Sequence, residues 1–356
     1  MPVFTPFAPP RSLCIGPYTL PHAVLAAPMA GVTDQPFRQL CRRFGASYAV
    51  AEMVAARPDL RRSLKSRLRS HWAGEAAPVA VQIVGANAPD MAEAAAWAID
   101  QGAHVIDINM GCPAKKVCSQ WSGSALMQNE ALALQIIEAV VAACAPHGVP
   151  VTLKMRTGWS AAHRNAPALA RAAEGAGVQM IVIHGRTREQ LYKGQAEYDT
   201  IAAVKAAVRL AVVANGDIDS PAKAAAVLAA TDADGVMLGR AAWRAPWLIG
   251  QTAHFLRTGH ELAQPLTLHV RAALLDHLQA HYGLYGHEAG VRSARKHLQR
   301  MLGGLPGTAP LLQTLMAQTE ARLQWQAVDE FLLRLAERHE RLPRPALAPA
   351  SAAAAD

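Results

Sequence analysis

The chain contains the stretch VIDINMGCPAKK at residues 105–116. Apolar and polar residues alternate from Val105 to Asn109, a pattern that predicts a short β-strand. A glycine then favours a turn, which sets Cys112 on a loop at the C-terminal end of the strand. Pro113 restricts the backbone of Cys112 to extended conformations, so its thiol has a defined direction. The stretch alone leaves two interpretations open: a small apolar side chain that fills a turn, and a thiol that takes part in chemistry.

Seven further apolar runs resemble this strand, and Ala- and Leu-rich segments with helical spacing separate them. The eight runs are Val24–Ala27, Tyr48–Ala51, Val79–Ile83, Val105–Asn109, Val151–Met155, Met180–His184, Ala211–Asn215 and Gly235–Leu238, and clear helical segments include Pro89–Asp100, Glu130–Ala143 and Ala166–Ala176. Strands that alternate with helices fold as right-handed βαβ units around a parallel sheet. The pattern therefore predicts an α/β protein with a (β/α)8 TIM barrel. An open doubly wound sheet is the alternative, but no GxGxxG signature follows the first run.

The pattern changes after the last barrel unit. From Thr267 to Arg341 only helical patterns occur, with breaks at residues 282–286 and 303–307, so we expect a small helical bundle. The sequence thus predicts four parts, an irregular N-terminal arm at residues 1–15, the barrel at 16–258, a helical domain at 259–341 and a disordered Pro/Ala-rich tail at 342–356.

Composition and charge narrow the class of protein. Hydrophobic residues make up 51% of the 356 residues, enough for a large core. Thirty-five Lys and Arg against 27 Asp and Glu give a net charge of +8, which favours an anionic partner such as nucleic acid or a phosphorylated cofactor. The five cysteines contain no CxxC pair, so neither a disulfide framework nor a zinc cluster is indicated. With no secretory signal or apolar span of membrane length, we expect a cytoplasmic monomer without a metal ion or a membrane partner.

Polar residues at the C-terminal ends of the strands are the candidates for an active site, because barrel enzymes place their chemistry on that face. They are Glu52, Gln82, Asn109, Cys112, Lys154, Arg156, His184, Arg186, Asn215, Asp217 and Arg240, together with the loop Pro28, Met29, Ala30 and Gly31. Each one alone has a structural interpretation: Lys154 could extend to solvent, and His184 could be a hydrogen-bonded structural histidine.

The segments NGDI (215–218) and MLGRA (237–241) follow the seventh and eighth strands. Loops at these two positions of a barrel commonly bind phosphate, since glycines let backbone N–H groups approach the anion. Gly216, Gly239 and Arg240 are therefore predicted phosphate ligands, although both glycines could simply make tight turns. A ring attached to that phosphate would extend toward Lys154, whose cation could stabilise negative charge on a reduced ring.

One series of motifs runs through all the barrel strands. Its members are APMAGVTD, VQIVG, DINMGCPAKKV, SGSALM, LKMRTGW, HGRTRE, ANGDI and MLGRA. The series resembles that of the bacterial tRNA-dihydrouridine synthases, closest to the DusB subgroup, and spans roughly Ile15 to Asp329. The resemblance implies an FMN-binding TIM barrel followed by a helical tRNA-binding domain. It also implies reduction of the C5–C6 double bond of a D-loop uridine in tRNA, with NADPH as the reductant.

By this resemblance ten residues match the family's FMN-contacting positions, namely Pro28, Met29, Ala30, Gln82, Lys154, Asn215, Gly216, Asp217, Gly239 and Arg240. Cys112 matches the family's proton donor, which protonates C5 of the uracil after hydride from reduced flavin has reached C6. We place His184 with the cofactor-binding residues, and Asn109 and Arg186 with the substrate-binding residues. The uridine position and the preference for NADPH over NADH stay open.

A stacked uridine must leave its helix to meet a flavin, which requires a surface that binds RNA. Two basic stretches are candidates, Arg57–Arg69 and the segment 291–300. In the second, Arg292, Lys296 and Arg300 follow i, i+4, i+8 spacing on one helix face, and Arg295 is adjacent. The other interpretation is a solvated charged face. Arg292, Arg295 and Lys296 are predicted to bind tRNA. Replacing Arg295 and Lys296 by Ala should therefore weaken tRNA binding and flatten its salt dependence.

The chain departs from the family after the proposed proton donor. Residues 118–122 read CSQWS, where family members often carry a basic pair, so the role of this loop in substrate binding is open. Cys118 could form a disulfide with Cys112 under oxidising conditions.

Three other functions fit parts of the sequence. Lys154 could be a Schiff-base nucleophile of an aldolase that binds a sugar phosphate, in which case the pure protein would be colourless. A flavoenzyme could instead reduce a free pyrimidine, although such a substrate would not need a basic helical domain. A tRNA-binding protein without catalysis is the third, and it would not require Cys112 or the phosphate loops.

Overall fold

The computed structural model describes residues 12–61 and 63–344 of the chain. Its main sheet is formed by the strands β3 (Val24–Ala26), β4 (Tyr48–Ala49), β5 (Val54–Ala55), β6 (Ala80–Val84), β7 (Val105–Met110), β8 (Val151–Arg156), β9 (Met180–His184), β10 (Ala211–Asn215) and β11 (Gly235–Leu238). Every paired neighbour is parallel, in the order β4-β3-β11-β10-β9-β8-β7-β6-β5. The two ends of this order, β4 and β5, are consecutive pieces of one chain segment, and a bridge from Val50 to Ala80 joins that segment to β6. The sheet therefore closes on itself, and the predicted (β/α)8 barrel is confirmed.

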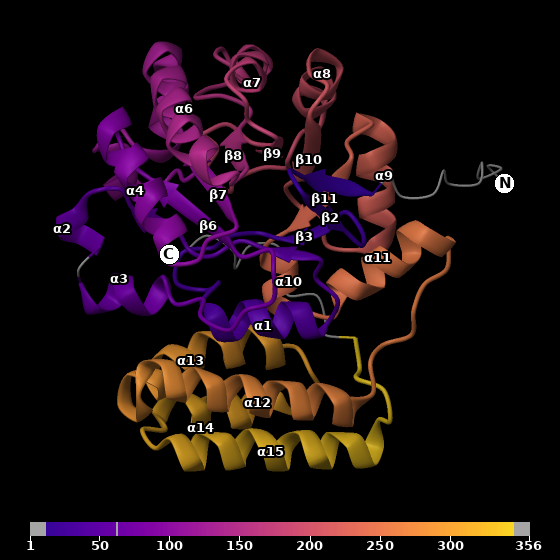
Figure 1. The fold of residues 1–356 in the computed structure, drawn as a ribbon. Coiled ribbons are helices and arrows are strands. Elements are labelled where there is room, and N and C mark those ends of the chain that lie inside the picture. Colours follow the sequence, from indigo (N-terminus) through magenta and orange to yellow (C-terminus); the bar gives the residue numbers. More distant parts are fainter. Residues whose placement is uncertain (1–11, 62, 345–356) are drawn as a thin grey trace, which may run out of the picture.

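Helices surround the barrel (Figure 1). The longer ones are α1 (Gln35–Arg43), α4 (Ala88–Asp100), α6 (Glu130–Cys144), α7 (Ala166–Gly175), α8 (Asp199–Ala207), α9 (Pro221–Thr231) and α11 (Leu248–Thr258), and the short ones are α2 (Pro58–Arg61), α3 (Leu64–Arg69), α5 (Lys115–Cys118), η1 (Gly123–Gln128), η2 (Ala145–His147) and α10 (Arg240–Arg244). Several begin at a side-chain cap, as where Asn87 accepts from the Asp90 amide at the start of α4. The segment Glu130–His147 is long and apolar enough to cross a membrane by length and composition. In the fold it contains α6, which packs against α4 with Ile136 and Ile137 fully buried.

A β-hairpin closes the N-terminal end of the barrel. Its strands β1 (Leu13–Ile15) and β2 (Tyr18–Leu20) pair antiparallel around Gly16, whose φ of +57° lies in the left-handed region. Leu13, Ile15 and Leu20 join a buried cluster with residues that begin barrel strands, among them Tyr48, Val105 and Met180. The expectation of an irregular arm up to residue 15 is therefore wrong for Leu13–Ile15, while residues 1–11 lie outside the described part of the chain.

Four helices follow the barrel, α12 (Thr267–Tyr285), α13 (His287–Leu302), α14 (Thr308–Ala317) and α15 (Ala321–Arg338). They lie together below the barrel, with α12 and α13 nearest to α1 and α10 (Figure 1). Apolar residues of this bundle belong to the same buried cluster as the outer layer of the barrel. Leu342 is buried and its amide donates to the Pro265 carbonyl at 2.9 Å, so the predicted tail begins at least one residue later than expected. Residues 345–356 are not part of the description.

Candidate active site

Polar side chains replace apolar ones inside the barrel near the C-terminal ends of the strands. Because strand residues alternate in direction, Val105, Asp107 and Asn109 of β7 all face one side of the sheet. Gln82 of β6 donates to Asp107 at 2.6 Å and accepts from Asn109 at 2.7 Å. Thr152 of β8 donates to the second oxygen of Asp107 at 2.6 Å. These bonds fix the strand ends from which the candidate residues extend.

The loop after β7 presents Cys112 in a defined position. Asn109 Oδ1 accepts from the amides of Gly111 and Cys112 at 3.0 and 2.9 Å, which folds the chain back over the strand end. Burial raises the pKa of the Cys112 thiol, so this thiol is neutral at pH 7. Cys118 Sγ lies 3.5 Å from the Cys112 carbonyl oxygen, and both thiols are free. A neutral thiol has the protonation state that a proton donor needs, whereas a nucleophile would need the thiolate.

Lys154 and His184 lie on neighbouring strands. Lys154 Nζ donates to Asn215 Oδ1 at 3.1 Å, and Asn215 donates in turn to the Met237 carbonyl at 2.8 Å. Burial, with help from Arg156, lowers the pKa of Lys154 to about 8. Burial and the surrounding cations hold the pKa of His184 well below its usual value, so its imidazole is neutral. At neutral pH the barrel mouth thus holds a partly buried ammonium beside an uncharged imidazole.

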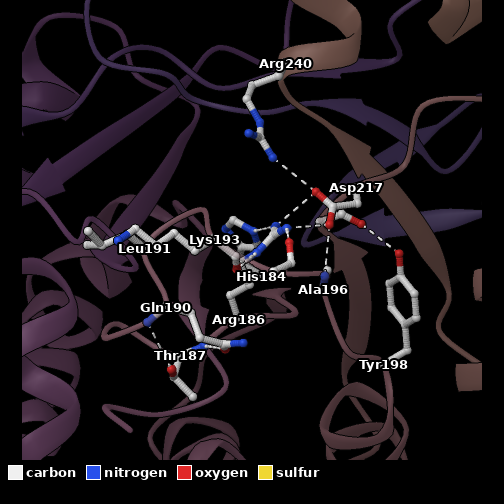
Figure 2. Close-up of polar contacts among 12 residues, drawn as sticks. His184, Arg186, Thr187, Gln190, Leu191, Lys193, Ala196, Tyr198, Asp217 and Arg240 are labelled. Carbon is white, nitrogen blue, oxygen red and sulfur yellow. Dashed lines mark hydrogen bonds and ion pairs between the residues drawn. The ribbon is translucent and has the colours of Figure 1, made fainter. Parts of the chain in front are cut away.

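Arg186, Asp217 and Arg240 form an ion-pair network between the loops that follow β9, β10 and β11 (Figure 2). Arg186 binds both oxygens of Asp217, at 2.9 and 2.5 Å, and Arg240 binds Asp217 at 3.0 Å. Arg186 also donates to the carbonyls of Lys193 and Gly194, and only 2% of its side chain is exposed. Arg186 thus joins the loops that follow β9 and β10, and its part in substrate binding stays a prediction.

Arg240 retains a more accessible side chain than Arg186, with 36% exposed. It is also the first residue of α10, and no side chain caps this helix, which leaves N–H groups of its first turn without helical partners. The Gly216 turn has a φ of +123°, and a Cβ there would lie 2.9 Å from Ala196 and 3.0 Å from His184, so the turn requires glycine. A Cβ on Gly239 would lie 3.8 Å from Met29 Sδ, which brings the first and last barrel loops together. Unpaired amides beside an arginine are suited to a phosphate group.

The structure gives roles to two further residues, of which Arg156 was already a candidate at a strand end and Asp107 was not. Asp107 is 2% exposed and holds Gln82 in place, a role indicated only by its period-two relation to Asn109. Arg156 is 1% exposed and donates to the carbonyls of Gly111, Thr187 and Leu191, all at 2.8 Å. Arg156 thereby joins the Cys112 loop to the loop after β9. Its sequence signal was the second cation of TLKMR at the end of a strand.

The residues predicted to bind tRNA on α13 do not share one environment. Arg292 is exposed and pairs with Glu288 at 2.8 Å. Arg295 donates to the Gln318 carbonyl at 2.7 Å, and Lys296 donates to the Gly31 carbonyl of the barrel. The helical spacing placed Arg292 and Lys296 on one face, but sequence could not show that Lys296 contacts the barrel whereas Arg292 is exposed.

Asp34, His281 and His297 form a group of potential metal ligands in the described part of the chain. Their ligand atoms lie within 4.8 Å of one another. They lie where the N-terminus of α1 meets α12 and α13 of the helical bundle. Trp243 donates to His297 Nδ1 at 3.2 Å, and burial holds the pKa of His297 well below its usual value. The proton of the neutral ring is therefore on Nε2, the nitrogen that a metal ion would need. His297 Nε2 has no hydrogen-bond partner in the described part of the chain.

Comparison with known proteins agrees with the motif resemblance. A family model described as Dihydrouridine synthase (Dus) matches residues 24–337. The tRNA-dihydrouridine synthase B of Xanthomonas axonopodis pv. citri is 55% identical over 284 residues, which cover 80% of this chain and 85% of that protein. The protein of the same name from Pseudomonas aeruginosa is 53% identical over 317 residues, covering 89% and 95%. A 2-naphthoyl-CoA reductase complex, 11% identical over 69% of this chain and 52% of that one, has a TM-score of 0.53 and supports the fold alone. The chain belongs to the dihydrouridine synthase family.

Proposed function

We propose that this protein is a tRNA-dihydrouridine synthase that uses FMN and NADPH to reduce the C5–C6 double bond of a D-loop uridine. One observation supports this function above the others. The Cys112 thiol, kept neutral by burial, lies within electrostatic reach of the partly buried Lys154 ammonium at the mouth of a barrel. A proton donor beside a cation suits the reduction of a polarised double bond.

The chemistry of the residues at the mouth supports flavin mononucleotide as the cofactor. The α10 amides, the Gly216 turn and Arg240 are suited to the phosphate, while Pro28, Met29 and Ala30 line the adjacent loop. Gln82, Lys154, Asn215 and Asp217 complete the proposed set, with His184 beside it. An aldolase with Lys154 as nucleophile would give colourless protein, so a yellow preparation separates the two functions.

The residues of the chain would divide the reaction between them. When bound, the reduced flavin supplies a hydride to C6 of the uracil, and NADPH restores the reduced cofactor. Cys112 then gives its proton to the electron pair left on C5, and the thiolate takes up a proton from solvent. Lys154 stabilises negative charge in the pocket, and Asn109, which orients the Cys112 amide, lies where the uracil edge would bind.

The helical domain at residues 259–341 is the proposed tRNA-binding part. Arg240 and Arg244 of α10 lie close enough to Arg300 of α13 to lower the pKa of Arg300, although burial is the larger cause. The Arg300 guanidinium lies over the Trp243 ring, 5.8 Å from its centroid. These arginines connect the barrel mouth to the helical bundle, and such a basic surface suits an RNA backbone. Arg292 extends it along α13.

Replacing Cys112 by Ala tests the assigned chemistry. The variant should bind FMN and oxidise NADPH as the wild type does, while reduction of uridine in tRNA falls by two or more orders of magnitude, roughly the contribution of a positioned acid. Cys118→Ala, in the same loop, is the matched control and should reduce uridine normally. Dihydrouridine mapping in tRNA from cells that carry each variant gives the product and its position. Near-normal turnover by Cys112→Ala would remove this residue from the role of acid.

A further inference from the structure

The loop from Pro28 to Asp34 is held at Gly31 by two charged side chains. The Gly31 amide donates to Glu52 Oε2 at 2.5 Å, and its carbonyl accepts from Lys296 Nζ. Glu52 is 1% exposed and lies between β4 and β5, whereas Lys296 comes from α13, 265 residues further along the chain than Gly31. Gly31 itself has a φ of +74°, a left-handed conformation that glycine adopts without strain. We call this arrangement the Gly31 clamp, formed by Glu52, Gly31 and Lys296.

The rest of the loop is bonded mainly to itself. The amides of Val32 and Thr33 both donate to the Met29 carbonyl at 3.0 Å, and the Met29 amide donates to Thr33 Oγ1 at 2.9 Å. Asp34 then begins α1 by accepting from the Phe37 amide. The exposed tip of this turn therefore takes its position from the Gly31 clamp and from α1, both of which contact the helical bundle.

We propose that Lys296 is a positioning residue for the cofactor loop, and that the helical domain is thereby a structural part of the flavin site. This inference rests on the proposed function, since it assumes that Met29 and Ala30 contact FMN. A hydrogen bond from an ammonium to a backbone carbonyl in a partly buried place is stronger than a neutral one. Because Lys296 uses its charge on Gly31, it does not act as a phosphate contact for tRNA.

Lys296→Met separates these two roles, because methionine keeps much of the side-chain volume but cannot donate. We expect apo-protein of this variant to bind FMN about tenfold more weakly than wild type, as the loss of one charged hydrogen bond would produce. Amide hydrogen exchange in residues 29–34 should become faster, while the salt dependence of tRNA binding stays as in wild type. Lys296→Arg retains a cation and should recover most of the FMN affinity. Arg292→Ala, on the same helix but exposed, should leave FMN affinity unchanged.

Unchanged FMN affinity and loop exchange in Lys296→Met, with a salt slope for tRNA lowered by about one phosphate contact, would overturn the proposal. If Lys296→Met does not fold, Glu52→Met, which cannot accept from the Gly31 amide, addresses the same clamp from the barrel side: faster exchange at residues 29–34 supports the clamp, and wild-type exchange contradicts it. Failure of the proposed function gives a different result. Wild-type protein would then not bind FMN, whereas the exchange rates would still decide whether Lys296 orders the loop.

Discussion

Lys154 is a residue whose charge changes within the working range of the protein. Burial lowers its pKa to about 8, below the value of 10.5 for a free lysine, so the ammonium is largely present at pH 7 and lost as the pH rises through 8. Because FMN is an anion, its affinity should fall about tenfold between pH 7 and 9, the limit for linkage to one proton. The same shift means that between about pH 8 and 10.5 the unfolded chain binds more protons, so this residue adds stability to the apo-protein as the pH rises.

Fluorescence titration of apo-protein with FMN at several pH values measures this dependence. Lys154→Arg stays charged throughout, so its affinity should not vary across the window. Lys154→Met should bind weakly at every pH. A wild-type curve as flat as that of Lys154→Met would show that Lys154 does not contact the cofactor.

Individual site residues differ in how far sequence could place them. Cys112 and Lys154 were placed correctly at the strand ends because the period of a strand and the barrel rule together fix where a side chain begins. The partners of Arg186 and Lys296 were not predictable, because their long side chains bind backbone carbonyls that tertiary packing brings near. Sequence spacing predicts where the backbone of such a residue lies, but not which groups its charged end contacts.

Helix α13 should bind tRNA through selected arginines. Arg300 lies with Arg244 and Arg240 on the side of α13 that faces α10, whereas Arg295 is bonded to the Gln318 carbonyl. We expect Arg300→Ala to weaken tRNA binding and to lower the slope of log affinity against log salt by about 0.7 to 0.9, the loss of one phosphate contact. Arg295→Ala should change neither quantity.

Binding measured at three or more salt concentrations separates the two variants. Equal effects of Arg295→Ala and Arg300→Ala would contradict the assignment, since it depends on the different partners of the two side chains. The earlier expectation that Arg295 and Lys296 act together on RNA came from helical spacing alone.

The barrel strands and the long helices were predictable as elements because their apolar periodicity is strong. The hairpin β1–β2 was not recognised, although LCIGPYTL contains a Gly-Pro turn between two apolar runs. Three-residue strands carry too little periodicity to stand out, and their stability comes from packing on the barrel floor. The interruption between β4 and β5 likewise has no local signal.

Asp34 joins the barrel and the helical bundle, because it accepts hydrogen bonds from both parts. It caps α1 through the Phe37 amide at 3.1 Å and accepts from Tyr285 of α12 at 3.0 Å. Burial alone would raise the pKa of Asp34, but the hydrogen bond with His281 and the nearby histidines hold it well below its usual range. Its contribution to stability is therefore complete above the unfolded pKa near 3.8, and is lost only as the pH falls below that value.

Asp34→Ala should lower the free energy of unfolding at pH 7 by about 3 kcal/mol, because it removes a helix cap and leaves buried partners unpaired. Asp34→Asn keeps the cap and should cost less. Urea denaturation of the three proteins gives the values. A loss below about 0.5 kcal/mol in Asp34→Ala, the size of an ordinary surface change, would show that Asp34 does not join the two parts.

The hairpin at the N-terminal end of the barrel limits how substrates can reach the interior. Leu13, Ile15 and Leu20 fill the N-terminal end, and a Cβ on Gly16 would meet Pro150 at 3.0 Å, so the hairpin lies directly against the loops there. Anything that reaches the strand ends must therefore enter and leave through the opposite opening. Under the proposed function, NADPH and tRNA would share that opening and could not occupy it at the same time. Their half-reactions would then be separated by the order of binding and release.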